Sequence, residues 1–181
     1  MQFIAKFEKV SLRQFQADCE KLGFGKPYKE IAEAWDNLIL PKRATTGSAG
    51  YDFFLPFSVE FARKLGNENY NRGFDDPFCD WVTIPTGVRC QMNPEYFLML
   101  LPKSGLGYKY GFRLANTCGV ADSDYYGSDN EGHITAKVTT ENPLVMDAGF
   151  KYMQGIFIPY GVVVDDDAKG VRNGGFGSTG R

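Results

Sequence analysis

Apolar residues follow a helical repeat only in the first forty residues of the chain. Over residues 11–22 and 29–35 they fall every three or four positions, which places them on one face of an α-helix. Ser11 is a residue type that caps helix N-termini, and Gly23 is one that ends helices. The pattern therefore predicts two short helices within an N-terminal extension of residues 1–39.

From Leu40 onward the pattern changes to short apolar or aromatic runs separated by Gly, Pro, Asn and Asp. Many short strands with turn residues between them are typical of a β sandwich or barrel, so we predict an all-β core over residues 40–168. Residues 57–80 break the strand pattern and are predicted to form a surface insert. The strands are expected at residues 82–84, 87–90, 97–101, 134–138 and 156–158.

Composition narrows the class of protein. The 181 residues fit one domain, and 43% hydrophobic with 23% charged residues supports a packed core. A net charge of −2 gives no broad basic surface, which argues against nucleic-acid binding but leaves room for a small nucleotide pocket. No apolar run is long enough to span a membrane, and the first residues lack a secretion signal, so we expect a cytoplasmic protein with no membrane partner.

Cysteine and histidine usage argues against a zinc site. The four cysteines, at positions 19, 79, 90 and 118, show no CxxC spacing, and His133 is the single histidine. We expect free thiols and interpret His133 as a surface residue.

The C-terminal segment, residues 169–181, looks suited to closing over a ligand. Residues 174–180 combine glycines, which let a backbone approach an anion closely, with two hydroxyls and the aromatic ring of Phe176. A phosphate attached to a flat ring would fit such a segment, which we predict to be a mobile lid. A disordered terminus is the alternative.

Two internal segments carry further candidate chemistry. Lys103, Ser104 and Gly105 offer a cation, a hydroxyl and an open backbone, the groups that phosphate oxygens need, although a simple turn would look the same. Asp122 and Asp124 are two residues apart and would share a face on a strand. A solvated acidic turn is the alternative for that pair.

These segments, in this order, resemble the motifs of the homotrimeric dUTPases, enzymes that hydrolyse dUTP. The resemblance runs from about residue 40 to residue 180. It comprises residues 43–52 for the first motif, 103–106 with Gly111 for the second, 119–127 for the third, Gln154 with 155–159 for a weaker fourth, and 174–180 for the fifth.

The resemblance implies a jelly-roll-like β sandwich and a homotrimer whose active sites each draw on more than one subunit. It also implies conversion of dUTP to dUMP and pyrophosphate with Mg²⁺. In that family the triphosphate holds most of the ion, so we expect no direct protein ligand. Asp52 would act through water or would serve structurally by pairing with a nearby arginine.

The resemblance assigns roles in the third motif. Asp122 corresponds to the carboxylate that orients and deprotonates the water attacking the α-phosphorus. Tyr125 corresponds to the tyrosine beneath the deoxyribose, where a flat ring excludes a 2′-hydroxyl. Asn116 and the main chain around Gly119 and Val120 correspond to the groups that bind the uracil edge.

The other motifs correspond to phosphate handling. Ser104 and Gln154 match the catalytic-site serine and glutamine near the α-phosphate, and Gly105 opens the backbone beside them. Lys103 stands where the family usually has arginine, which keeps the charge but loses the bidentate geometry. Lys151 and Tyr152 replace the usual acidic and arginine residues of the fourth motif.

The lid departs from the family at one position. Phe176 corresponds to the ring that stacks on uracil, with Gly177, Ser178 and Thr179 near the γ-phosphate. Val171 stands where the family usually has arginine, and Arg172, one place later, is the candidate for that role.

Two other functions fit the same sequence. A dCTP deaminase of the same superfamily would release ammonia from dCTP. A regulatory protein would bind the nucleotide as a signal and would use residues 57–80 as the contact surface for a protein partner.

Overall fold

The computed structural model describes residues 4–62 and 81–174, and its ordered elements are mainly strands. The helices and strands run in the order β1 Ala5–Lys9, α1 Leu12–Lys21, α2 Tyr28–Asp36, β2 Lys42–Arg43, β3 Tyr51–Phe54, β4 Val59–Phe61, β5 Val82–Pro85, β6 Val88–Met92, β7 Tyr96–Pro102, α3 Ser104–Tyr110, β8 Arg113–Leu114, β9 Gly119–Ala121, the 3₁₀ helix η1 Ser123–Gly127, β10 Thr135–Thr139, β11 Leu144–Met146 and β12 Lys151–Pro159. The all-β core expected from the sequence is confirmed.

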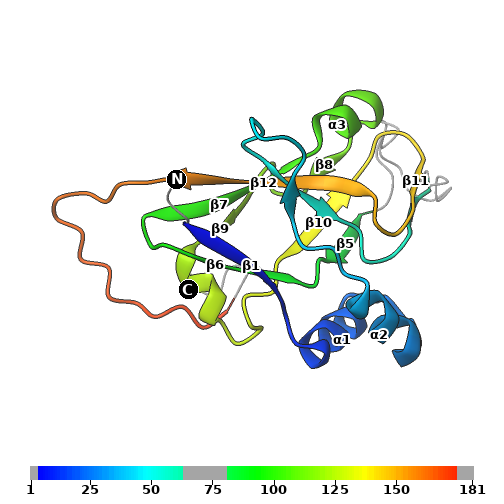
Figure 1. Cartoon of the computed structure of the whole chain (residues 1–181), viewed down its shortest axis with the longest axis horizontal. Coiled ribbons are helices and arrows are strands. Elements are labelled where there is room, and N and C mark those ends of the chain that lie inside the picture. The colour runs from blue at the N-terminus through cyan, green and yellow to red at the C-terminus, as the bar shows by residue number, and fades with distance from the viewer. Residues whose placement is uncertain (1–3, 63–80, 175–181) are drawn as a thin grey trace, which may run out of the picture.

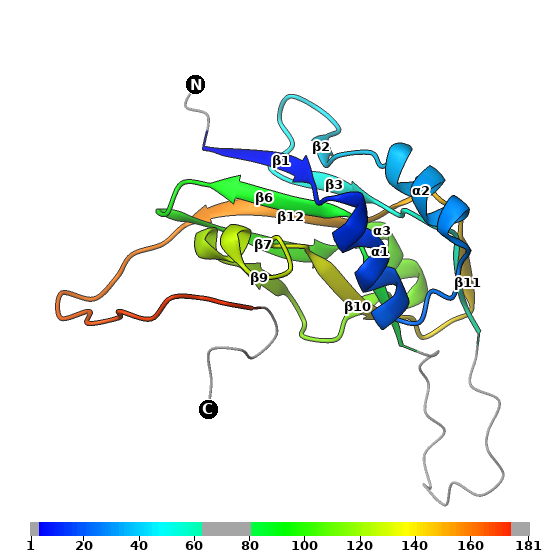
Figure 2. The same cartoon turned by 90° about the horizontal axis from the view of Figure 1, so that it is seen from below.

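Antiparallel pairing organises the described strands into four sheets. The largest has the order β2-β3-β12-β7-β9, and the others are β5-β10-β8, β1-β6 and β11-β4. Both views of the molecule show these sheets packed face to face, with α1 and α2 at one end and the C-terminal segment leaving β12 at the other (Figures 1 and 2). Residues 160–174 loop away from the sheets and then return toward them.

The main core lies between the sheets because their strands place apolar side chains inward. Phe53, Leu98 and Met153 come from the adjacent strands β3, β7 and β12, and each is almost completely buried. Gly155 of β12 leaves room for two of these side chains, since a Cβ there would lie 2.8 Å from Leu98 Cδ1 and 3.0 Å from Phe53 Cε2. The central strand therefore requires a glycine at this position.

The two predicted helices are present, and their ends have the expected causes. The Ser11 hydroxyl accepts a hydrogen bond from the Gln14 amide (3.1 Å), and Gly23 has a left-handed φ of +80° just after α1. Phe15 of α1 and Ile31 of α2 are buried with Phe57 in a second, smaller core cluster. This cluster attaches the helices to the β core.

The N-terminal extension also contains a strand that the sequence pattern did not predict. Strand β1 pairs antiparallel with β6 from Ala5–Met92 to Lys9–Val88. Its side chains show no clear alternation of buried and exposed positions. The sequence does carry a short strand signal here, since apolar and polar residues alternate from Ala5 to Glu8, but the pairing with β6 is what identifies the strand.

The described start of residues 57–80 is part of the core and not of a surface insert. Strand β4 pairs with β11, and Phe57, Val59 and Phe61 are all buried. The rest of the expected insert and its partner surface, residues 63–80, lie outside the described residues. Strand β4 was not predicted from the sequence because it is only three residues long.

The interpretation of His133 as a surface residue is wrong, because the side chain is fully buried. Its Nε2 atom accepts a hydrogen bond from the Gly87 amide (2.8 Å), so Nδ1 carries the proton and donates it to the Asp18 carboxylate (2.5 Å). Burial alone would raise the pKa of Asp18, but hydrogen bonds from His133 and Gln14 lower it below its ordinary value of 3.8. A buried imidazole thus joins α1 to the β core.

Among the helices of the described residues, none has the length and apolar content that a bilayer span requires.

Candidate active site

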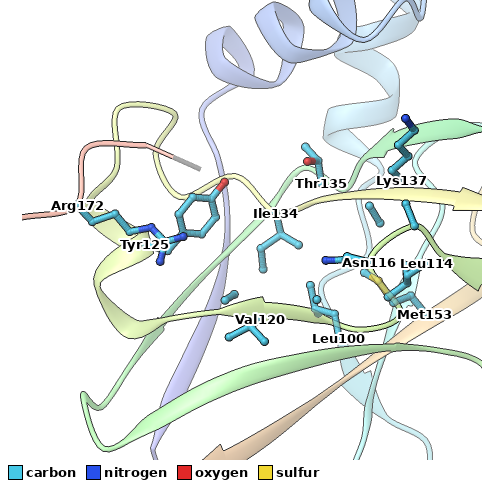
Figure 3. Close-up of a pocket in the computed structure, with 14 residues that line it drawn as sticks. Leu100, Leu114, Asn116, Val120, Tyr125, Ile134, Thr135, Lys137, Met153 and Arg172 are labelled. Atoms are coloured by element: carbon cyan, nitrogen blue, oxygen red, sulfur yellow. The ribbon is translucent and has the colours of Figure 1, made fainter. Parts of the chain in front are cut away.

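A cavity of about 390 Å³ opens beside β9 and β10 (Figure 3). Five residues assigned to nucleotide binding from the sequence line it: Asn116, Gly119, Val120, Tyr125 and Arg172. Apolar side chains such as Leu100, Ile134 and Met153 supply much of the remaining wall. A largely apolar cavity with a few polar groups is typical of a small-molecule site.

Tyr125 is held in one orientation at the cavity wall. Its hydroxyl donates to the His133 carbonyl (2.8 Å) and accepts from the Asn130 side-chain amide (2.8 Å). Burial raises the pKa of the Tyr125 phenol above its ordinary value of 10, so the group remains protonated at neutral pH. The ring can therefore present a fixed flat face to a ligand.

Arg172 brings the C-terminal segment to the cavity. Its guanidinium lies 5.0 Å from the centre of the Tyr125 ring, and its Nη1 atom is 2.5 Å from Asp122 Oδ2 and 3.5 Å from Asp124 Oδ1. The strand expected for these two carboxylates is not present: Asp122 is the N-cap of the 3₁₀ helix η1 and Asp124 lies in its first turn, and there both face Arg172. With half of its side chain exposed, Asp122 remains open to water.

A second cluster gathers around Asp52, away from the cavity. Lys103 Nζ donates to Asp52 Oδ1 (2.7 Å), and Lys151 Nζ lies 3.1 Å from Oδ2. Asp52 is buried, which alone would raise its pKa, but the hydrogen bonds from the two lysines lower the pKa below its ordinary value of 3.8. Asp52 therefore pairs with lysines and not with the arginine considered from the sequence.

Gln154 stands beside Asp52 on the neighbouring strand. The two residues are register partners between β12 and β3. The Gln154 side chain lies against Gly50, where a Cβ would be only 2.6 Å from its Oε1 atom. Gly50 of the first motif is thus needed to seat Gln154 of the fourth, a dependence that the sequence did not reveal.

Ser104 and Gly105 begin helix α3 directly after Lys103, and both are exposed. The Lys103 amide donates to the Tyr152 carbonyl (3.1 Å), which fixes the start of this segment against β12. A Cβ at Gly105 would meet nothing within 4 Å, so the backbone there is open to an incoming group. Lys103, Ser104 and Gln154 therefore lie near the Asp52 end of the sheet.

The sheet separates the two clusters within one chain. Gln154 pairs with Leu101 of β7, whereas Asp122 is one residue beyond the pair between Ala121 and Leu98. These positions differ by four residues along β7, about 13 Å at ~3.3 Å per residue, and by two strands across at ~4.8 Å each. The structure does not bring Asp122 together with Lys103 or Gln154.

Several candidate residues fall outside this geometry. Phe176, Gly177, Ser178 and Thr179 lie outside the described residues.

Within residues 4–62 and 81–174, no group of three or more His, Cys, Asp or Glu side chains is arranged to hold a metal ion.

Known proteins identify the family of this chain, although no protein-family model matches it. The chain is 36% identical over 147 residues to the deoxyuridine 5′-triphosphate nucleotidohydrolase of Lactococcus lactis subsp. lactis, in a match covering 78% of this chain and 87% of the relative. It belongs to the dUTPase family. The resemblance found in the sequence motifs is therefore confirmed.

Solved dUTPase structures share the fold. The dUTPase of Streptococcus mutans is 29% identical, with a TM-score of 0.59 over 87% of this chain and 97% of that one. A mutant dUTPase of phage phi11 of S. aureus also has a TM-score of 0.59, over 93% of this chain and 98% of that one, at 13% identity. The structure of that mutant reveals how a structural Mg(II) ion is coordinated. The predicted jelly-roll-like β fold is confirmed.

We expect acid to weaken the chain partly through Asp52. A carboxyl whose pKa is lowered by folding stabilises the native state above its unfolded pKa, here near 3.8, and loses that contribution as the pH falls through the folded value. Asp52→Asn should cost about 1 kcal/mol of unfolding free energy at pH 7, because both lysines keep contact with water. Urea unfolding between pH 7 and pH 3 should show a smaller pH dependence for the variant.

The exposed Glu60→Gln change on β4 is the control and should leave the pH dependence unchanged. Parallel pH curves for Asp52→Asn and the native chain would contradict the assignment of a coupled ion pair.

Proposed function

We propose that this chain hydrolyses dUTP to dUMP and pyrophosphate, at sites that each combine the Tyr125 cavity of one subunit with the Asp52 cluster of another subunit in a homotrimer. The observation that carries the shared site is the separation of the two clusters across β7, β9 and β12. Membership of the dUTPase family supports the reaction.

The cavity provides recognition of the base and sugar. Asn116 and the backbone at Gly119 and Val120 offer amide and carbonyl groups for the uracil edge, within apolar walls that favour a flat ring. Tyr125 places its ring beneath the sugar. A 2′-hydroxyl would clash with that buried ring, which explains selection for a deoxyribonucleotide.

Asp122 is the proposed base. Its half-exposed carboxylate accepts a proton from a water molecule, whose oxygen bonds to the α-phosphorus while the bond from that phosphorus to the bridging oxygen breaks. Pyrophosphate leaves with the electron pair of the broken bond. Arg172, which neutralises Asp122 in the free chain, can exchange this carboxylate for substrate phosphate oxygens.

The Asp52 cluster of another subunit supplies the phosphate contacts. Two ammonium groups and one carboxylate leave one net positive charge beside Gln154 and the exposed Ser104. Such a charge attracts the triphosphate without binding it irreversibly. In this arrangement Asp52 positions the lysines, because both of its oxygens already contact ammonium groups.

A magnesium ion fits this site as part of the substrate complex. The described residues contain no dense ligand group, whereas Asp122 and Asp124 are exposed enough to reach an ion through water. The ion would neutralise charge on the triphosphate. Residues 169–181 would close over the nucleotide, a prediction supported by the place of Arg172 at the cavity.

Pyrophosphate release from dUTP, dCTP, dTTP and UTP, measured with Mg²⁺ on one preparation, tests the reaction. We expect dUTP to exceed each of the others by at least about 100-fold in kcat/KM, because a mismatched edge leaves buried polar groups unpaired. Ammonia release from dCTP would identify a deaminase instead. Nucleotide binding without any release would favour a regulatory protein.

Replacing the proposed base should separate binding from turnover. For Asp122→Asn we expect kcat to fall by about 10²–10⁴-fold, the usual contribution of a positioned base. Affinity for a non-hydrolysable dUTP analogue should change little. Asp124→Asn is the matched control, because it disturbs the same arginine without removing the base; equal losses in binding and turnover for Asp122→Asn would argue against its role.

Mixed trimers test whether the site is shared. Asp122→Asn and Lys103→Ala chains, each inactive alone, should regain roughly a quarter of native activity when co-expressed, because random assembly places both native halves together in that share of sites. Asp122→Asn combined with Asn116→Ala should give no such gain, since both changes affect the same cavity. A mixture that stays inactive with Lys103→Ala would place the whole site in one chain.

A further inference from the structure

The N-terminal segment holds the loop that follows the catalytic aspartate at three points. Glu8 of β1 accepts a hydrogen bond from the Tyr126 hydroxyl (2.7 Å). Both carboxylate oxygens of Glu131 accept from Ser11, one from its amide (2.8 Å) and one from its hydroxyl (2.6 Å). Together with the bond between Asp18 and His133, these contacts connect residues 8–18 to residues 126–133.

The same loop determines the position of Tyr125. The Tyr125 hydroxyl points away from Arg172, toward the segment leading to Ile134, where it donates to the His133 carbonyl (Figure 3). Asn130 donates to that hydroxyl from the same loop. Gly132, with φ +69°, lets the chain pass close to the backbone of Tyr126, since a Cβ would lie 2.7 Å from its Cα. The chain between Tyr125 and His133 therefore has little freedom to move.

His133 is the rigid connection between helix α1 and the loop that holds Tyr125. It is completely buried, and both of its ring nitrogens are engaged, Nε2 by the Gly87 amide and Nδ1 by Asp18. The side chain of Asp18 is only 13% exposed, so water replaces this partner poorly. Losing the acceptor on α1 would leave a buried N–H unpaired and force the imidazole and its backbone to move.

We propose that helix α1, through Asp18 and His133, positions Tyr125 and so determines the discrimination between deoxyribose and ribose. The inference rests on the proposed function, in which Tyr125 lies beneath the sugar. Asp18 and His133 are positioning residues, because neither is among the residues that line the cavity. The N-terminal helices thereby gain a role in selectivity.

The size of the excluded group explains why a small displacement matters. A hydroxyl oxygen needs only about an extra ångström or two beneath the sugar, and misplacement of about 1 Å far from the chemistry can cost up to ~100-fold in rate. A loosened Tyr125 ring would admit UTP while holding dUTP less well. Selectivity is therefore a more sensitive measure of this contact than turnover.

Three variants of the full chain separate positioning from stability. Asp18→Leu removes the acceptor for His133, whereas Asp18→Asn keeps a carbonyl oxygen that can accept the same hydrogen bond. Ile31→Val weakens the small core cluster on α2, where the structure gives Ile31 no hydrogen bond to residues 123–133. The measurements are kcat and KM for dUTP and UTP, at a temperature where all three variants are folded.

For Asp18→Leu we expect the dUTP to UTP ratio of kcat/KM to fall roughly tenfold, mainly through a higher KM for dUTP. Asp18→Asn should recover most of the ratio, and Ile31→Val should leave it at the native value. A lower melting temperature with an unchanged ratio for Asp18→Leu would overturn the proposal.

Hydrogen exchange provides a readout independent of catalysis. Without nucleotide, amides of residues 123–133 should exchange faster in Asp18→Leu than in Ile31→Val, because the loop has lost its attachment to α1. Equal exchange in the two variants would also overturn the proposal. If the native chain fails to hydrolyse dUTP, the proposed function fails, but the exchange comparison still tests the mechanical connection.

Discussion

The antiparallel register of β7 is the constraint on which the arrangement of the site depends. This strand pairs with β12 on one side and with β9 on the other, and its Leu98 and Leu100 are buried in the core. Each pairing fixes one functional group: Gln154 with the Asp52 cluster near the Leu101 end, and Asp122 beyond Leu98. A sheet cannot slip by one residue without turning its apolar face outward, so the two groups stay apart. This separation is the reason for proposing that a partner copy completes the site.

Charge pairing prepares both halves for a polyanionic substrate. In the free chain Arg172 lies against Asp122 and Asp124, and Lys103 and Lys151 lie against Asp52. None of these charges is buried without a partner, which would be costly. In the proposed site, triphosphate oxygens replace the carboxylates as partners of Arg172, while Asp52 keeps the two lysines in position.

The N-terminal segment contributes both to the stability of the fold and to the proposed selectivity for a deoxyribonucleotide. Phe15 and Ile31 attach the helices to the core through apolar burial, while Ser11 and Asp18 hold the loop that carries Tyr125. The imidazole of His133 connects the helices to this loop, because it is buried and both of its ring nitrogens are hydrogen-bonded. An extension outside the family motifs can in this way influence the site without touching the substrate.

The sequence by itself determined the fold class, the two helices and the family, because periodicity, capping residues and motif order are local properties of the chain. The strand expected for Asp122 and Asp124 is replaced by the start of a 3₁₀ helix, and only the structure shows that both carboxylates meet Arg172. Only the tertiary structure decided that β1 and β4 are strands, that Asp52 pairs with Lys103 and Lys151, and that His133 is buried against Asp18. Each of these depends on residues far apart in the chain, and no local pattern encodes which distant partner a strand or a charge will meet.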